Sequence, residues 1–258
     1  MPLEGRILLA HVLGRDRAWL AAHADAALSD AQAALFDALA SRRRNGEPVA
    51  FLTGRREFFG LDLEITPDVL IPRPETELLV EMALERIDDQ TAARVLDLGT
   101  GSGAVALAIA QQRPCASILG VDASAQSVAL ARSNALRLRI ANAEFVQSDW
   151  FDQVPHESFS VVVANPPYIA EFDPHLHEGD LRFEPAMALT GGADGLAPIR
   201  VIVARAPEYL ADGGWLLLEH GYDQSDRVQG LLRDAGFSPV ESRRDLAGIL
   251  RATGGRVV

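Results

Sequence analysis

The feature that most constrains this chain is a repeated unit of strand, turn and helix that starts at Arg94. Short apolar runs predict strands, and the longer periodic segments between them predict helices. The expected strands occupy residues 95–99, 117–122, 143–150 and 159–164, and the helices between them occupy residues 104–112 and 124–139. Strands that alternate with helices favour a mostly parallel sheet with helices on both faces. In such a sheet, ligands bind at the carboxyl ends of the strands.

The C-terminal part of the chain extends this sheet. A helix from residue 194 to about residue 210 precedes an apolar strand at residues 213–220. A further helix at about residues 223–235 and two strands, at about 238–243 and 249–253, follow it. The sequence therefore predicts an α/β fold with seven strands.

A glycine-rich turn, Gly99-Thr100-Gly101-Ser102-Gly103, follows the first of these strands. Glycine lets the backbone approach a ligand closely, and the helix N-terminus behind the turn favours negative charge. Gly99, Gly101 and Ala104 also satisfy the dinucleotide fingerprint G-x-G-x-x-G/A, which leaves an NAD-dependent oxidoreductase open. The turn indicates a nucleotide-like cofactor without deciding which one.

Acidic residues end the next two strands. Asp122 is suitably placed for both hydroxyls of a ribose, although it could also serve as a helix cap before Ser124. Asp149 can accept a hydrogen bond from the amino group of an adenine, and Trp150 can pack on the ring. Because no second half of a pyrophosphate site is evident, a single-nucleoside cofactor fits better than NAD.

The fourth strand ends in Asn165-Pro166-Pro167-Tyr168, which cannot continue as sheet because successive prolines supply no N–H. This corner offers the Asn165 side-chain oxygen, the Pro166 carbonyl and the flat face of Tyr168 to a planar –NH2 group. Such a nitrogen is a poor nucleophile because its lone pair is delocalised. Two acceptors that each take one N–H can aim the lone pair at an electrophilic carbon, by positioning more than by acid–base catalysis. A plain strand-ending turn is the structural alternative.

The N-terminal part differs from the repeated units. Residues 1–47 are expected to form a small helical domain, in which Ser29 starts a helix with capping-box spacing and Asn45-Gly46 ends it. Residues 48–76, rich in aromatic residues and glycine from Phe51 onward, suggest a hairpin linker. Residues 77–258 then form the cofactor-binding domain.

Composition limits the classes of function. The chain has 258 residues, of which 48% are hydrophobic and 23% charged, and a net charge of -12, which argues against tight binding of long nucleic acid. No apolar run approaches the roughly 18 residues of a membrane span, and the start lacks signal-peptide features. A single cysteine, Cys115, excludes an internal disulfide framework. We expect a cytoplasmic protein, a monomer with no membrane contact.

His175-Leu176-His177 has no accompanying ligand cluster, so we expect no metal.

These motifs together resemble a class I S-adenosylmethionine-dependent methyltransferase that acts on nitrogen. The segments Ile71-Pro72-Arg73-Pro74-Glu75-Thr76-Glu77, Ser148-Asp149-Trp150-Phe151, Asp173-Pro174-His175-Leu176 and Arg182-Phe183-Glu184-Pro185 resemble, more narrowly, the release-factor glutamine methyltransferase family. That family methylates the side-chain amide nitrogen (N5) of the glutamine in the Gly-Gly-Gln motif of peptide-chain release factors, a modification that bears on translation termination. The resemblance covers nearly the whole chain. Leu8-Leu9-Ala10-His11 resembles a family segment usually preceded by another helix, so we expect a shortened helical domain.

The resemblance implies a fold and a set of site residues. The fold is the Rossmann-like class I sheet, whose last strand runs antiparallel to the others. The glycine turn faces the methionine part of the cofactor, Asp122 its ribose, and Asp149 with Trp150 its adenine. Asn165 borders the cofactor and, with Pro166, Pro167 and Tyr168, holds the glutamine amide. Residues 171–185 form a lid or docking loop fixed by Arg182 and Glu184, and Arg73 and Glu75 line the cleft between domains, although helix initiation and salt bridging also explain that second pair. The product is S-adenosylhomocysteine.

Two further alternatives stay open from the sequence. A DNA or RNA amino-methyltransferase carries a similar four-residue corner, but acidic charge and the lack of a target-recognition insertion disfavour it. A non-catalytic S-adenosylmethionine-binding module would arise if the substrate loop were defective.

Overall fold

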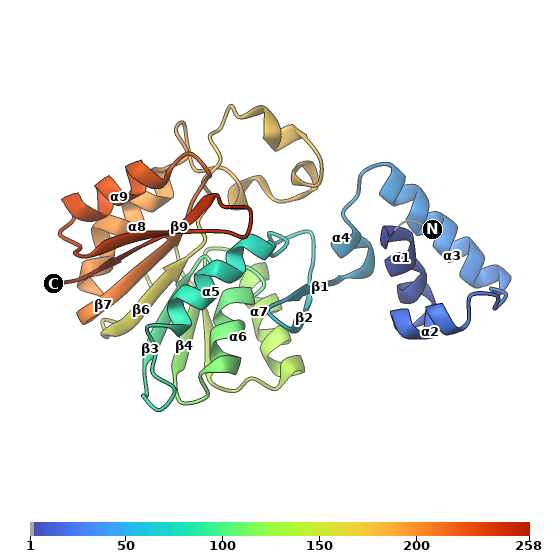
Figure 1. Cartoon of the computed structure of the whole chain (residues 1–258), viewed down its shortest axis with the longest axis horizontal. Coiled ribbons are helices and arrows are strands. Elements are labelled where there is room, and N and C mark those ends of the chain that lie inside the picture. Colours follow the sequence, from blue (N-terminus) through green and yellow to red (C-terminus); the bar gives the residue numbers. More distant parts are fainter. Residues whose placement is uncertain (1–2) are drawn as a thin grey trace.

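The structure is a computed structural model that describes residues 3–258, apart from the side chain of His177. A group of helices at the N-terminus stands beside a larger α/β body, and the chain between them forms a short hairpin (Figure 1). Within the described residues, no helix combines the length and the apolar character needed to cross a membrane.

The α/β body is built on one seven-stranded sheet with the order β5-β4-β3-β6-β7-β9-β8. Its strands are β3 (Arg94–Leu98), β4 (Ser117–Asp122), β5 (Ala143–Gln147), β6 (Phe159–Ala164), β7 (Leu210–Glu219), β8 (Val240–Arg244) and β9 (Leu250–Arg256). Strands β3 to β7 pair in parallel, and β9 is antiparallel to both of its neighbours. The predicted mostly parallel sheet with an antiparallel last strand is confirmed.

Helices cover both faces of the sheet, which explains why its central strands are continuously apolar. One face packs against α5 (Glu77–Leu84), α6 (Ala104–Gln112) and α7 (Ala125–Leu138), and the other against α8 (Ala197–Arg205) and α9 (Ser225–Asp234). Along β6, Val161 and Val163 belong to the first core, whereas Val162 and Ala164 belong to the second. Side chains therefore alternate between two buried layers, as strand geometry requires.

The order of the strands reverses between β3 and β6. From β3 the chain crosses to β4 and then β5 on one side, and then returns to place β6 on the other side of β3. The carboxyl ends of β3 and β6 therefore lie next to each other at a topological switch point. Open α/β sheets bind ligands at such points.

The N-terminal helices are α1 (Leu3–Leu13), α2 (Arg17–Ala22), α3 (Asp30–Arg44) and α4 (Val49–Thr53). Leu8, Leu39 and Leu52 form their small core. The capping box predicted at Ser29 is present, and Asn45 caps the C-terminus of α3.

Several details of the expected secondary structure were wrong. Strand β5 ends at Gln147 rather than at residue 150, and α8 begins at Ala197 rather than at residue 194. Residues 49–53 form α4 rather than part of a hairpin, because Leu52 packs into the core of the N-terminal helices; the hairpin is limited to β1 (Arg55–Phe58) and β2 (Leu61–Glu64). The helix expected to reach residue 210 ends at Arg205, and a 3₁₀ turn, η5 (Ala206–Glu208), follows it. Pro207 in this turn has no N–H to continue an α-helix.

Candidate active site

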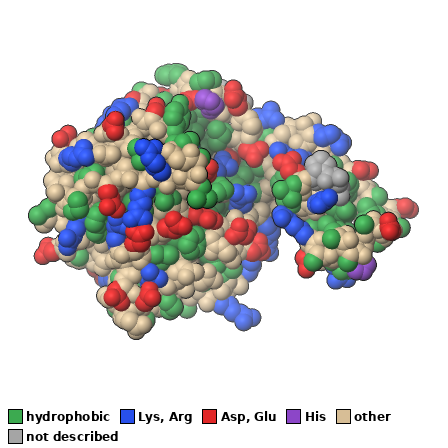
Figure 2. Space-filling view, in the orientation of Figure 1, with side chains coloured by type: hydrophobic (Ala, Val, Ile, Leu, Met, Phe, Trp, Pro, Cys, Tyr) green, Lys and Arg blue, Asp and Glu red, His purple; other side chains and the backbone are tan. Residues whose placement is uncertain are grey.

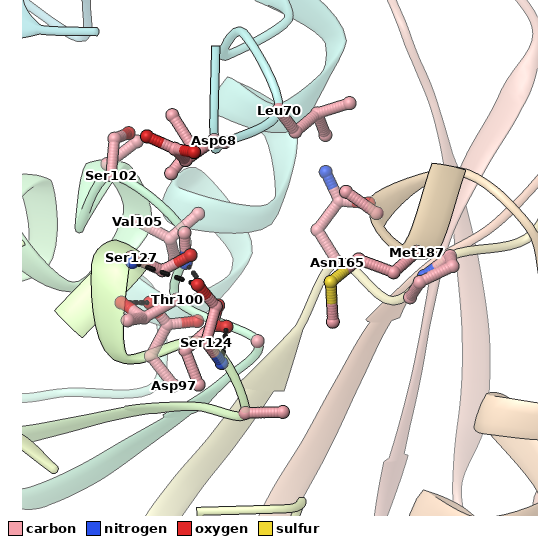
Figure 3. Close-up of a pocket in the computed structure, with 18 of the residues that line it drawn as sticks. Asp68, Leu70, Asp97, Thr100, Ser102, Val105, Ser124, Ser127, Asn165 and Met187 are labelled. Atoms are coloured by element: carbon pink, nitrogen blue, oxygen red, sulfur yellow. Dashed lines mark hydrogen bonds between the residues drawn. The ribbon is translucent and has the colours of Figure 1, made fainter. Parts of the chain in front are cut away.

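A cavity of about 270 Å³ opens at the carboxyl ends of β3, β4, β5 and β6. Its volume is near the lower end of the roughly 300–1,000 Å³ of typical ligand pockets. Figure 3 shows Thr100, Ser124 and Ser127 on one side of this cavity and Asn165 and Met187 on the other. The cavity therefore lies at the switch point of the sheet.

The glycine turn forms one wall of the cavity. Gly99 and Gly101 have φ angles of 72° and 55°, which favour glycine, and no side chain blocks the space that a Cβ at Gly101 would enter. The Thr100 hydroxyl donates to Asp97 Oδ2 at 2.6 Å, which ties the turn to β3. Gly99, Thr100, Gly101 and Ser102 line the cavity, whereas Gly103 lies behind them against Ala131 of α7.

Asp122, at the end of β4, lines the cavity and is itself held by the backbone. Its Oδ2 accepts from the Gly101 N–H and its Oδ1 from the Ser124 N–H, both at 2.9 Å. An ionised carboxylate has about four acceptor sites, so two remain for a ligand. Through these bonds Asp122 connects the glycine turn to the start of α7. The bond to the Ser124 N–H corresponds to the capping role considered from the sequence.

Asp149 and Trp150 form the end wall beyond β5, and both line the cavity. Asp149 is exposed, and Trp150 is half-buried with a φ angle of 46°, a left-handed conformation that is uncommon outside glycine. The Ser148 hydroxyl donates to the Trp150 carbonyl at 2.9 Å and supports this turn. The indole edge is 3.7 Å from the point where a Cβ on Gly99 would stand, so the two segments enclose a narrow space.

The four-residue corner after β6 is divided between the cavity and the protein interior. Asn165 and Pro167 line the cavity, and Pro166 is buried behind them. No backbone N–H of the described residues donates to the Pro166 carbonyl. Tyr168 does not line the cavity, and its hydroxyl donates to Glu219 Oε1 at 3.3 Å. Burial and the adjacent Glu219 charge raise the pKa of this phenol.

Arg73, Glu75, Arg182 and Glu184 do not line the cavity. The Glu184 side chain is fully buried, accepts from the Ile71 N–H at 3.0 Å and pairs with Arg73. Burial raises the pKa of Glu184, and the Arg73 charge opposes that rise. Arg182 donates to the Asn45 carbonyl at 2.7 Å, and Glu75 is exposed. The Arg73–Glu184 and Arg182–Asn45 contacts therefore join residues 171–185 to the linker and to the end of α3.

Of the two histidines in this loop, only the His175 side chain is described. His175 Nδ1 is 2.6 Å from Asp173 Oδ1, which raises the pKa of the imidazole, and the His177 side chain lies outside the described residues. Among the described side chains, no three potential ligands are grouped around a common point.

Comparison with known proteins identifies the family. The model of the methyltransferase small domain matches residues 75–178, and that of the PrmC N-terminal domain matches residues 2–54. The chain is 56% identical to the release factor glutamine methyltransferase of Burkholderia pseudomallei over 261 residues, which cover 99% of this chain and 92% of that protein. It is 48% identical to the enzyme of the same name from Escherichia coli over 253 residues, covering 98% and 91%. This chain belongs to the release factor glutamine methyltransferase family.

Solved structures agree with the fold of this release factor glutamine methyltransferase family member. A methyltransferase from Pyrococcus furiosus superposes with a TM-score of 0.59 at 19% identity, covering 84% of this chain and 96% of that one. A T. thermophilus 16S rRNA methyltransferase, solved with AdoMet and guanosine, superposes with a TM-score of 0.57 at 20% identity, covering 79% and 50%. The class I methyltransferase fold and S-adenosylmethionine as methyl donor, both expected from the sequence, are confirmed.

The residues around the cavity of this family member fit S-adenosylmethionine. Asp122 has free acceptor sites for ribose hydroxyls, and Asp149 is an exposed acceptor next to the planar surface of Trp150. Open space over Gly101 leaves room for the methionine part.

Asp97 and Thr76 were missed by the sequence reasoning, and Glu219, at the end of an expected strand, was left out because a structural hydrogen bond explains it equally well. Asp97 lines the cavity. Burial raises the pKa of its carboxyl to about 6, although the hydrogen bonds from Thr100 and the Ala106 N–H lower that pKa. Thr76 lines the cavity from η1 (Pro74–Thr76), and Glu219 is buried behind the corner at the end of β7. The signal for Asp97 and Glu219 was available, since each is an acid within an apolar strand and such residues rarely stay buried without a role.

Proposed function

We propose that this enzyme transfers the methyl group of S-adenosylmethionine to the side-chain amide nitrogen of the glutamine in the Gly-Gly-Gln motif of peptide-chain release factors. The observation that supports this most is the position of Asn165 beside the cofactor cavity, on the strand next to the glycine turn. The names of the most similar relatives point to the same substrate.

Binding of the cofactor is assigned to the residues around the cavity. We assign its methionine part to the turn of Gly99, Thr100, Gly101, Ser102 and Gly103, its ribose to Asp122, and its adenine to Asp149 and Trp150. When bound, S-adenosylmethionine supplies an electrophilic methyl carbon on a positively charged sulfur. Asn165 borders the cavity and is assigned to both the cofactor and the substrate amide.

The corner activates the glutamine amide by orienting it. The Asn165 side-chain oxygen and the Pro166 carbonyl each accept one N–H of the substrate, which turns the nitrogen lone pair toward the methyl carbon. Holding two reacting groups in this geometry can contribute several kcal/mol to the rate. Pro167 and the Tyr168 ring fix the shape of the corner. As the methyl carbon bonds to nitrogen its bond to sulfur breaks and S-adenosylhomocysteine leaves, and because no general base is assigned, the extra proton of the nitrogen passes to water.

Contact with the release factor is assigned to the surfaces around the opening. Met187 and Ala188, which follow residues 171–185 in the chain, line the cavity, and Met187 is 64% exposed. In this proposal Arg73, Glu184 and Arg182 hold that segment in place, and the exposed Glu75 is available to the partner. We propose that the enzyme acts in the cytoplasm, where translation takes place, and that it is a monomer.

A nucleic-acid substrate is less favoured. The net charge is -12, and on the face in Figure 2 acidic and basic side chains are interspersed rather than gathered into a basic stripe. Long nucleic acid would meet repulsion over most of such a surface.

Transfer of labelled methyl groups to three substrates tests the proposal. Purified enzyme with labelled S-adenosylmethionine is incubated with a release factor, with the same factor carrying alanine in place of the Gly-Gly-Gln glutamine, and with unmethylated duplex DNA. Label only on the unaltered release factor supports the proposal. Label on the DNA, or equal label on the alanine-substituted factor, contradicts it.

A further inference from the structure

A line of polar side chains runs from the cavity into the protein behind Asn165. The Asn165 Nδ2 donates to the Thr76 hydroxyl oxygen at 3.2 Å, and the Tyr168 hydroxyl donates to Glu219 Oε1. Thr76 and Glu219 are 3% and 2% exposed, so water does not compete at these positions. Two of the four corner residues are therefore connected to buried groups.

One oxygen of the Glu219 carboxylate accepts no hydrogen bond within the described chain. Its Oε2 is buried and has no partner within hydrogen-bond geometry among the described residues. The Thr76 hydroxyl is nevertheless near enough to lower the pKa of this carboxyl. The Thr76 O–H is thus an available donor to Glu219 rather than a formed one, and leaving a buried carboxylate oxygen unpaired is costly.

The single hydrogen of the Thr76 hydroxyl decides how the Asn165 amide is oriented. If Thr76 donates to Glu219, its oxygen can only accept, and it must receive the N–H of Asn165. The Asn165 oxygen then has no protein donor in the described chain and is left for the cavity, where a substrate N–H needs an acceptor. If Thr76 donated to Asn165 instead, the amide would present its own N–H to the substrate, and two donors would face each other.

We infer that Thr76 and Glu219 are positioning residues that keep the oxygen of Asn165 directed at the substrate amide. Neither touches the reacting atoms in this arrangement; both act through Asn165. The inference rests on the proposed function, because an acceptor at Asn165 is needed only for a substrate that carries N–H groups.

The charge of Glu219 supports this arrangement. The groups that face it are Tyr168 after β6, Thr76 and Glu75 in η1, and Arg251 in β9, and burial raises its pKa to about 7. Only the ionised carboxylate must accept from Thr76, whereas the protonated acid can donate to it and reverse the line of hydrogen bonds. Turnover should therefore rise as the pH is raised through about 7.

Thr76→Val and Thr76→Ser separate the hydroxyl from the shape of the side chain. We expect Thr76→Val to lower kcat for release-factor methylation by about tenfold or more, and Thr76→Ser to restore most of it. Calorimetry should give an S-adenosylmethionine Kd within about threefold of the unaltered enzyme, since Asn165, and not the cofactor pocket, is misdirected. Thr253→Val is a matched control: its hydroxyl is equally buried and bonds His220 and Ser242, so Tm should fall while kcat is kept.

Glu219→Gln provides a second test that does not depend on Thr76. The neutral amide keeps the shape and can donate to Thr76, so we expect a lower kcat and the loss of its rise near pH 7. Equal kcat for Thr76→Val and Thr76→Ser, or a Glu219→Gln enzyme with the unaltered pH profile, would overturn the inference while the unaltered enzyme still methylates the release factor. If the unaltered enzyme transfers no methyl group, the proposed function fails, and the inference fails with it.

Discussion

Replacing Arg73 with methionine removes the cationic partner of a buried carboxylate. The Glu184 side chain is fully buried, whereas that of Arg73 is 28% exposed. Removing one partner of a buried ion pair costs about 3–5 kcal/mol, because the other charge is left in a poorly solvated place. The Ile71 N–H still bonds Glu184, and the carboxyl can take up a proton, so we expect a loss near the lower end, about 3 kcal/mol, at pH 7.5.

The opposite change, Glu184→Gln, should cost much less. The glutamine oxygen can keep the bond from the Ile71 N–H, and water reaches the partly exposed Arg73 guanidinium. We expect a loss of about 1 kcal/mol, typical of a single charge-assisted hydrogen bond near the surface. The two variants therefore differ by roughly 2 kcal/mol although they break the same pair.

Urea unfolding of both variants and of the unaltered enzyme measures this difference. The loss caused by Arg73→Met should shrink as the pH is lowered from 7.5 to 5, because burial already raises the pKa of Glu184 and the variant no longer has the arginine that opposes the rise. A protonated carboxyl needs no counter-charge. Equal losses for the two variants at pH 7.5, or a loss from Arg73→Met that grows at pH 5, would refute the reasoning.

Three other predictions concern the site. Asn165→Ala should lower kcat by about a hundredfold or more, as the loss of one positioned hydrogen-bonding group does elsewhere, while calorimetry gives a nearly unchanged Kd for S-adenosylmethionine. Asp122→Ala should weaken cofactor binding about tenfold or more in the same calorimetric assay, because two charge-assisted bonds to the ligand and those to Gly101 and Ser124 are lost; Asp226→Ala, an exposed carboxylate on α9, is the control and should bind normally. Asp97 and Glu219 have pKa values raised to about 6 and about 7, so the folded state holds protons that the unfolded chain releases; their contribution to stability is present below about pH 4 and lost as the pH rises through 6 to 7. Asp97→Asn should accordingly make the urea midpoint vary less between pH 5.5 and pH 8.

Features that depend on neighbours in the sequence were predicted well. The helix start at Ser29 follows from a capping box within four residues, and the strand before Asn165 follows from a continuous apolar run. The glycine turn and Asp122 were predicted from residue types and spacing, and Gly99, Gly101 and Asp122 line the cavity.

Features that depend on packing between distant segments could not be predicted. Arg73 was expected to line the cleft between the domains, and its ion-pair partner Glu184 is 111 positions away, so only the folded chain shows that the two residues meet outside the cavity. The contact of Thr76 with Asn165 spans 89 positions. Helix α4 was missed because its five residues are too short to show a clear period and are stabilised by a core that the other helices supply.

The methylated residue can be identified by mass spectrometry of a release factor after incubation with this enzyme and S-adenosylmethionine. We expect the factor to gain the mass of one methyl group, fragmentation to locate it on the glutamine of Gly-Gly-Gln, and Asn165→Ala enzyme to add almost none in the same time. A methyl group on another residue, or an unmodified factor from enzyme shown by calorimetry to bind the cofactor, would show that this chain does not methylate that glutamine.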